Sequence, residues 1–237
     1  MARAPARLPH GTRISDHVTL GVLTATVPAA LIDAVLADTG RQSRRQRQLP
    51  ARLMVYYVIA LALYARASDG EGLRWLRLAG TDPDLAGKSA ITRARTRLGA
   101  DPLKQLFQRV ARPCAEPGTP GAWYRGRRLV SLDGTTIDLP DTPALERRFG
   151  RPAAARGASG FPQLRLLTLT ETGTHAIFAI AFDRYAAGEV RLASELLQRV
   201  QPGMLCLADR AFVGLALWRT ATATVSGADL LWRVRRN

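Results

Sequence analysis

The chain has 237 residues, of which 47% are hydrophobic and 22% are charged. This length and composition allow one large or two small hydrophobic cores, and they exclude a globally disordered protein. The formal net charge of +15 indicates a polyanionic partner, most simply nucleic acid. Two cysteines, Cys114 and Cys206, are too few for a disulfide framework or a cysteine-rich zinc site.

The positive charge is concentrated in the first half of the chain. Residues 1–128 contain 21 basic and 9 acidic side chains, net +12, whereas residues 129–237 contain 13 and 10, net +3. This division predicts a DNA-binding module followed by a catalytic one. The basic residues are 32 Arg and 2 Lys. Arginine suits bidentate phosphate contacts, but a GC-rich genome would produce the same bias.

Helices dominate the pattern of residues 1–112, the predicted basic DNA-binding domain. After an arm at residues 1–15, apolar spacing and helix breakers predict helices at Pro28–Asp38, Ala51–Ala67, Ser89–Leu98 and Asp101–Ala111, with a short turn or helix at Gly72–Leu78. The cluster Arg41–Arg47 (RQSRRQR) is either a solvated linker or a phosphate-binding segment. Its candidate DNA contacts are Arg44, Arg45 and Arg47.

The two helices around Gly99 have the spacing of a helix-turn-helix. Arg93 and Arg97 are four residues apart and share a helix face, while Ile91 and Leu98 face the expected core. A helix that reads a DNA groove has this pattern, and so does a solvated helix face. Under the first interpretation, Arg93 and Arg97 are candidate DNA contacts.

From residue 129 the pattern changes from helices to strands, after a Pro- and Gly-rich linker at residues 113–128. The expected order is β-β-β-α-β-α-β, with strands at Leu129–Leu139, Leu164–Thr170, His175–Phe182, Met204–Asp209 and Asp229–Val234, and helices at Glu189–Val200 and Gly214–Ala223. The fold class is therefore α/β: a helical N-terminal region, then a mixed sheet whose later strands are parallel and buried. In this order the first strand is central and the fourth lies beside it.

Two of these strands carry an aspartate where a buried strand normally has an apolar residue. Asp133 lies in LVSLDGTTIDL, and Asp209 ends the apolar run of LCLADRAF. Two neighbouring carboxylates raise each other's pKa unless a cation binds them, and Mg²⁺ prefers oxygen ligands. We therefore expect Asp133 and Asp209 to be metal ligands for Mg²⁺ or Mn²⁺ at a site for phosphodiester chemistry. The alternatives are a turn cap at Asp133 and an ordinary strand-end residue at Asp209.

Other polar and aromatic residues favour structural interpretations. Asp138 and Asp141 are expected to be turn residues near Pro140, and His175 is expected to be structural because the three histidines are scattered. Trp218 and Trp232 are expected in the core.

Taken together, these motifs resemble bacterial insertion-sequence transposases of the insertion-sequence-four family, whose catalytic domain is a ribonuclease H-like DDE domain. The matching segments are LIDAVLADTGRQSRRQRQLPARL (31–53), LDGTTIDLPDTP (132–143), Phe149-Gly150, FPQLRLLTLT (161–170) and MLCLADRAF (204–212). The resemblance implies that Asp133 and Asp209 are the first two catalytic aspartates and that Arg210 meets a phosphate. It also implies that the partner is double-stranded DNA at the element's terminal inverted repeats, in the bacterial cytoplasm at the nucleoid, with no membrane partner. A homodimer is left open.

The third acidic ligand of the family is a Glu on a later helix, beyond the strand at residues 229–234, and the printed sequence ends at Asn237. Glu171, Glu189 and Glu195 lie between the two aspartates in sequence and do not match it. We therefore expect residues 129–237 to be a catalytic domain truncated before the Glu, in an inactive transposase. The alternative is a non-catalytic DNA-binding regulator or inhibitor of transposition. A third interpretation is a metal nuclease that uses only two carboxylates.

Overall fold

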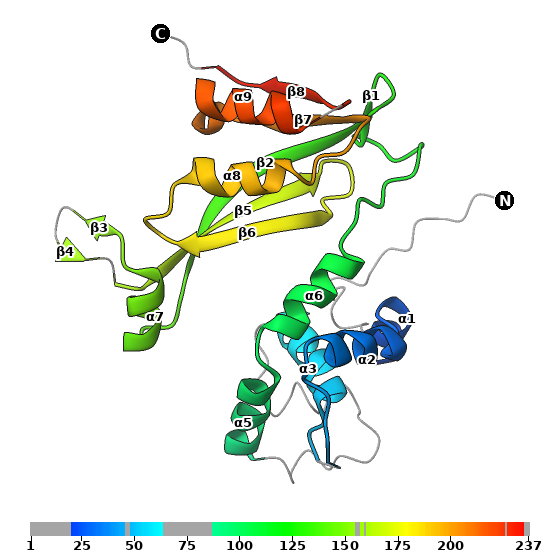
Figure 1. Cartoon of the computed structure of the whole chain (residues 1–237), viewed down its shortest axis with the longest axis vertical. Coiled ribbons are helices and arrows are strands. Elements are labelled where there is room, and N and C mark those ends of the chain that lie inside the picture. The colour runs from blue at the N-terminus through cyan, green and yellow to red at the C-terminus, as the bar shows by residue number, and fades with distance from the viewer. Residues whose placement is uncertain are drawn as a thin grey trace, which may run out of the picture. The chain divides into compact units, whose positions relative to one another are not determined.

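The computed structural model of this chain divides into two compact units, residues 1–110 and residues 111–237 (Figure 1). The residues that it describes are 20–45, 48–63, 87–154, 157–158, 160–225 and 227–234. None of the helices formed by these residues is long and apolar enough to cross a membrane.

The first unit is helical. Its helices are α1 (Leu20–Thr26), α2 (Ala29–Asp38), α3 (Ala51–Leu63), α5 (Lys88–Leu98) and α6 (Asp101–Val110). These bounds agree with the four helices that the sequence predicts, within a few residues. The expected arm at residues 1–15, the segment Gly72–Leu78 and Arg47 lie outside the described residues.

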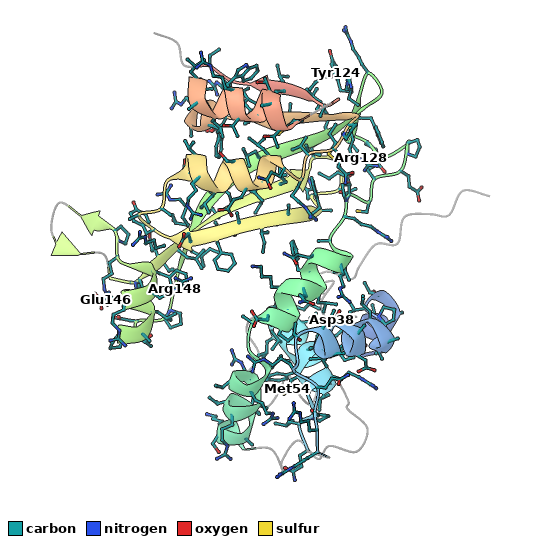
Figure 2. The ribbon with its side chains drawn as sticks, viewed as in Figure 1. Asp38, Met54, Tyr124, Arg128, Glu146 and Arg148 are labelled. Carbon is teal, nitrogen blue, oxygen red and sulfur yellow. The ribbon has the colours of Figure 1, made fainter. Side chains whose placement is uncertain are left out.

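The core of the helical unit forms where the apolar stripes of α1, α2, α3, α5 and α6 meet. Ile32 of α2, Met54 and Tyr57 of α3 and Ile91 of α5 are completely or almost completely buried (Figure 2 labels Met54). Leu98 and Ala94 are buried beside Ile91, so the predicted core face of α5 is confirmed. The helix ends at Gly99, whose φ of 72° a residue with a side chain rarely adopts.

The second unit is a mixed sheet with helices. In chain order its elements are β1 (Trp123–Tyr124), β2 (Arg127–Asp138), α7 (Pro143–Phe149), β3 (Ala153–Ala154), β4 (Gly157–Ala158), β5 (Gln163–Glu171), β6 (Ile177–Arg184), α8 (Glu189–Leu197), β7 (Met204–Ala208), the short 3₁₀ helix η2 (Arg210–Phe212), α9 (Leu215–Thr224) and β8 (Asp229–Trp232). The sheet order is β6-β5-β2-β7-β8, and β1 also pairs with β2. β5 is antiparallel to β2 and β6, whereas β7 is parallel to β2 and β8. The expected central position of the first long strand, with the fourth beside it, is confirmed.

The two faces of the sheet differ. Val130 and Leu132 of β2 and Leu167 of β5 are buried in one core with the apolar residues of α8 and α9. Side chains alternate between the two faces of a strand, and some apolar side chains on the opposite face are exposed to solvent. Phe182 has an exposed fraction of 54% and Leu231 one of 61%. The expectation that the last strand is buried is wrong, because β8 pairs only with β7 among the described strands and forms an edge of the sheet.

The predicted linker at residues 113–128 is also corrected by the structure. Part of this segment is β1, which pairs with β2 through a two-residue turn at Arg125 and Gly126, both with positive φ. Gly173, in the turn after β5, approaches Ala122 so closely that a Cβ there would lie 2.5 Å from the Ala122 Cβ. The segment is therefore a packed part of the second unit.

A buried carboxylate holds this segment in place. Glu171, the last residue of β5, is completely buried and forms an ion pair with Arg128, which Figure 2 labels. It also accepts hydrogen bonds from the backbone N–H groups of Cys114 and Ala115, at 3.1 and 2.8 Å, and from the Thr174 hydroxyl. Burial raises the pKa of Glu171, but these hydrogen bonds more than offset it, so its pKa lies below the ordinary value of 4.5.

We expect Arg128→Leu to lower the free energy of unfolding by about 3–5 kcal/mol, because it leaves a buried carboxylate without its cation. Urea denaturation near neutral pH measures this change. The matched control is Arg127→Leu, which removes the neighbouring exposed ion pair with Asp229 and should cost no more than about 1 kcal/mol.

The same change has a predicted pH dependence. A carboxylate whose pKa is lowered by folding stabilises the native state above its unfolded pKa, and this contribution disappears as the pH falls through the folded pKa. The difference in unfolding free energy between wild type and Arg128→Leu should therefore narrow at acidic pH, below about 4. A difference that stays constant from pH 7 to pH 3 would contradict the charged state assigned to Glu171.

Candidate functional site

The two aspartates predicted as metal ligands occupy neighbouring positions at the carboxyl ends of β2 and β7. Leu132 and Ala208 are register partners in this parallel pair, and Asp133 and Asp209 follow them directly. The backbone of Asp209 is extended, with φ −79° and ψ 177°. Side-chain alternation therefore continues from the buried Leu132 and Ala208, and it places both carboxylates on the face opposite α8 and α9.

Both carboxylates are exposed, and each is oriented by a local hydrogen bond. Asp133 Oδ1 accepts from the N–H of Gly134, and Asp209 Oδ1 accepts from the N–H of Ala211, both at 2.8 Å. The Ala211 bond caps the 3₁₀ helix η2. Within the described part of the chain, the second oxygen of each carboxylate accepts no hydrogen bond and forms no ion pair. These oxygens fit a hard divalent cation such as Mg²⁺.

Glu189 does not join the aspartates, although it opens α8 near the same end of the sheet. It forms an ion pair with Arg165 of β5. Arg165 is two residues before the buried Leu167 on β5, and side chains two positions apart on a strand share a face. Arg165 therefore lies on the helix-covered face, opposite the face that carries Asp133. Among the described residues, no group of three or more His, Cys, Asp and Glu side chains is arranged to hold a metal.

A helix that the sequence prediction missed follows the carboxyl end of β2. Thr142 caps α7 through its hydroxyl, which accepts from the Leu145 N–H at 3.3 Å, and Gly150 ends the helix with a φ of 78°. The signals for this helix are Thr-Pro at its start and Gly at its end. It presents Glu146 and Arg148 to solvent (Figure 2).

The two aspartates that the sequence predicts as turn residues, Asp138 and Asp141, have side-chain partners near α7. Asp141 forms an ion pair with Arg151, and Asp138, the last residue of β2, accepts a hydrogen bond from the Gln163 side chain at 2.6 Å. Both carboxylates are thus bound by side chains of the protein, unlike those of Asp133 and Asp209 in the described part of the chain. His175 is exposed in the turn before β6, with a φ of 58°.

The two tryptophans expected in the core differ in burial. Trp232 is buried, whereas Trp218 is 40% exposed on α9 and contacts the Trp232 ring edge-to-face at a centroid distance of 5.2 Å. The expectation holds for Trp232 alone.

The predicted DNA contacts that the structure describes are exposed but belong to different parts of the chain. Arg93 and Arg97 share the solvent face of α5, and Arg44 and Arg45 lie in the connection after α2. Arg210 belongs to the second unit, directly after Asp209. Four of these predicted DNA contacts thus belong to the helical unit, and one, Arg210, lies beside the aspartates.

Comparison with known proteins finds relatives of this chain among transposases. Residues 17–108 match the family model described as insertion element 4 transposase N-terminal. The chain is 30% identical over 189 residues to the transposase InsG for insertion sequence element IS4 of Escherichia coli K12, which aligns 79% of this chain. It is 27% identical over 212 residues to the putative transposase InsZ of the same organism, aligning 84% of this chain and 68% of InsZ.

Most of this chain is therefore similar to IS4-element transposases. It spans 42% of the length of InsG. A solved structure, the piggyBac transposase synaptic complex with hairpin DNA, aligns with 95% of this chain and 53% of its own length, with a TM-score of 0.45 and 10% sequence identity.

We expect this chain to bind Mn²⁺ weakly through Asp133 and Asp209, because two carboxylates alone position a divalent ion poorly. Binding is measured in electron paramagnetic resonance titrations as a decrease of the free Mn²⁺ signal. Asp133→Asn or Asp209→Asn should abolish this decrease. Glu189→Gln is the matched control and should leave the binding unchanged. Equal loss in Glu189→Gln would show that the metal lies elsewhere.

Proposed function

We propose that this chain is the DNA-binding and aspartate-bearing part of a DNA transposase. The observation that carries the proposal is the neighbouring position of Asp133 and Asp209 at the carboxyl ends of two parallel strands, in a chain similar to IS4 transposases. In this proposal residues 111–237 are a ribonuclease H-like DDE domain. The strand order β6-β5-β2-β7-β8, antiparallel on one side of β2 and parallel on the other, supports that assignment.

Asp133 and Asp209 would hold Mg²⁺ or Mn²⁺ through their outer carboxylate oxygens. A bound divalent ion at such a site activates an attacking oxygen and stabilises the leaving oxygen of a phosphodiester. The N–H groups of Gly134 and Ala211 fix the orientation of the two carboxylates. Arg210, next to Asp209 in the chain, would bind a phosphate oxygen of the DNA.

The helical unit would bind the ends of the element as double-stranded DNA. Its described acidic side chains are few, and Asp33 and Asp38 are already paired with Arg52 and Arg109. The exposed arginines of α5 and of the connection after α2 keep their charge for the phosphate backbone. Such contacts position a protein on DNA without reading its sequence.

One observation favours a second function. No third acidic side chain joins Asp133 and Asp209 among the described residues. A chain of this composition that occupies DNA ends without cutting them would act as a regulator or inhibitor of transposition.

We expect the full chain to bind duplex DNA with an affinity that falls steeply with salt. Each phosphate that the protein neutralises contributes about −0.9 to the slope of log affinity against log salt concentration. Fluorescence anisotropy with a labelled duplex measures this slope. Absence of binding at low ionic strength would refute the DNA-binding part of the proposal.

We expect the purified 237-residue polypeptide with Mg²⁺ or Mn²⁺ neither to nick supercoiled plasmid nor to join DNA strands. The reason is that metal catalysis needs fixed coordination geometry, and two carboxylates do not provide it. Adding a polypeptide that supplies a Glu-bearing helix should give cleavage, and Asp133→Ala or Asp209→Ala should abolish it. Metal-dependent nicking by the 237-residue chain alone, lost in both aspartate variants, would instead favour a two-carboxylate nuclease.

A further inference from the structure

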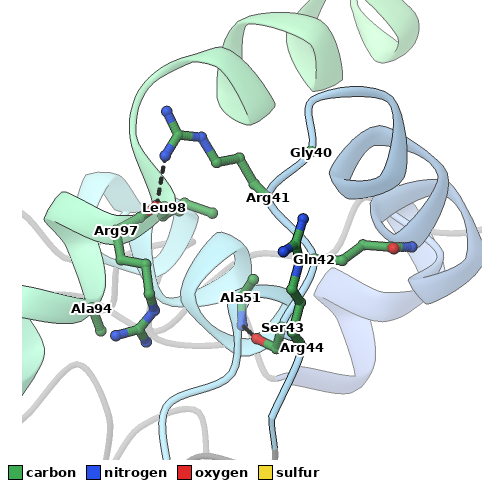
Figure 3. A pocket seen from close by; sticks show the side chains of 9 residues that line it. All are labelled: Gly40, Arg41, Gln42, Ser43, Arg44, Ala51, Ala94, Arg97 and Leu98. Carbon is green, nitrogen blue, oxygen red and sulfur yellow. Dashed lines mark hydrogen bonds between the residues drawn. The ribbon is translucent and has the colours of Figure 1, made fainter.

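The helical unit contains a small pocket between the connection after α2 and the carboxyl end of α5 (Figure 3). Its volume is about 220 Å³, and three of the side chains that line it are Arg41, Arg44 and Arg97. Ser43 also lines it, and its hydroxyl accepts a hydrogen bond from the Ala51 N–H at 2.9 Å. The pocket thus joins two segments that lie more than 50 residues apart in the chain.

Two of the three guanidinium groups are held in place by backbone carbonyl groups. Arg41 Nη1 donates to the carbonyl oxygen of Arg97 at 3.2 Å, and Arg97 Nη2 donates to that of Leu49 at 2.9 Å. Each bond uses only one of the five N–H donors of a guanidinium. The Arg44 guanidinium forms no hydrogen bond or ion pair with the described residues, so most of the donors at this pocket are available to a ligand.

The charge of the pocket is not compensated by acidic side chains of the described residues. No described Asp or Glu lines it, and Asp33 and Asp38, two of the described acidic side chains of this unit, are paired with other arginines. Three like charges around one cavity repel each other unless an anion binds between them. The cavity is smaller than the roughly 300–1,000 Å³ of pockets for whole small molecules. These properties favour a single compact oxyanion with several acceptor oxygens.

We propose that this pocket binds one phosphate group of the DNA backbone through Arg41, Arg44 and Arg97. The proposal rests on the DNA-binding function proposed above and adds a specific contact to it. Arg97 belongs to α5, which also carries the exposed Arg93, so a phosphate held here would fix the position of that helix along the duplex. The planar fork of arginine matches the oxygens of a phosphate.

The test uses the full chain with Arg44→Gln, since Arg44 is exposed and makes no contact that the fold needs. Anisotropy titrations with a labelled duplex should show about tenfold weaker binding at low salt, the loss expected for a charge-assisted hydrogen bond. The slope of log affinity against log salt should become shallower by about one. Arg97→Lys, which keeps the charge but not the fork, should also weaken binding.

The matched control is Arg199→Gln, which removes the same charge from an exposed arginine of the second unit that has no ion pair among the described residues. If Arg44→Gln and Arg199→Gln weaken binding equally, only net charge matters; the pocket proposal is then overturned while the DNA-binding function stands. If the wild-type chain binds no duplex, both proposals fail. Inorganic phosphate is the second probe: calorimetric binding that Arg44→Gln removes, without any binding of duplex, would assign the pocket to free phosphate and overturn the DNA contact.

Discussion

The parallel pairing of β2 with β7 determines where both candidate carboxylates lie. Leu132 and Ala208 are buried register partners, and burial of a leucine side chain contributes about 1.5–3 kcal/mol. A slip of one residue along β2 would expose Leu132 and turn Asp133 into the core, where an ionised carboxylate is costly. The apolar core therefore holds the register, and the register places Asp133 and Asp209 side by side on the uncovered face. Their mutual repulsion is tolerated because it acts in solvent, where charge interactions are weak.

The second constraint is the buried carboxylate of Glu171. It binds two backbone N–H groups of the segment after α6 and the guanidinium of Arg128 on β2. This single residue thereby connects the beginning of the second unit to two of its strands. Arg128 also lies over the Trp123 ring at 4.6 Å and adds a cation–π contact to the same anchor. A chain cut at residue 128 would divide this arrangement, whereas a cut at residue 110 would leave it whole.

The sequence predicted the long elements of the fold because each has a strong apolar period. It also predicted the neighbouring positions of Asp133 and Asp209, since the strand order alone brings the ends of the first and fourth strands together. It missed α7, which buries no residue and so leaves only its caps as a signal. It described residues 113–128 as a linker because the hydrogen bonds that order them come from Glu171, more than 50 positions away. The joint pocket of Arg41 and Arg97 depends on a contact of the same range, which spacing does not reveal.

The two cysteines make the chain chemically simple to label. Burial raises the pKa of the Cys206 thiol to about 12, so almost none of it is thiolate at neutral pH, and the thiolate is the reactive form. Cys114 is exposed, and its own N–H is bound to Glu171. A maleimide fluorophore therefore attaches selectively at residue 114 without any engineered cysteine. There its emission would report on whether the segment after α6 remains attached to the sheet.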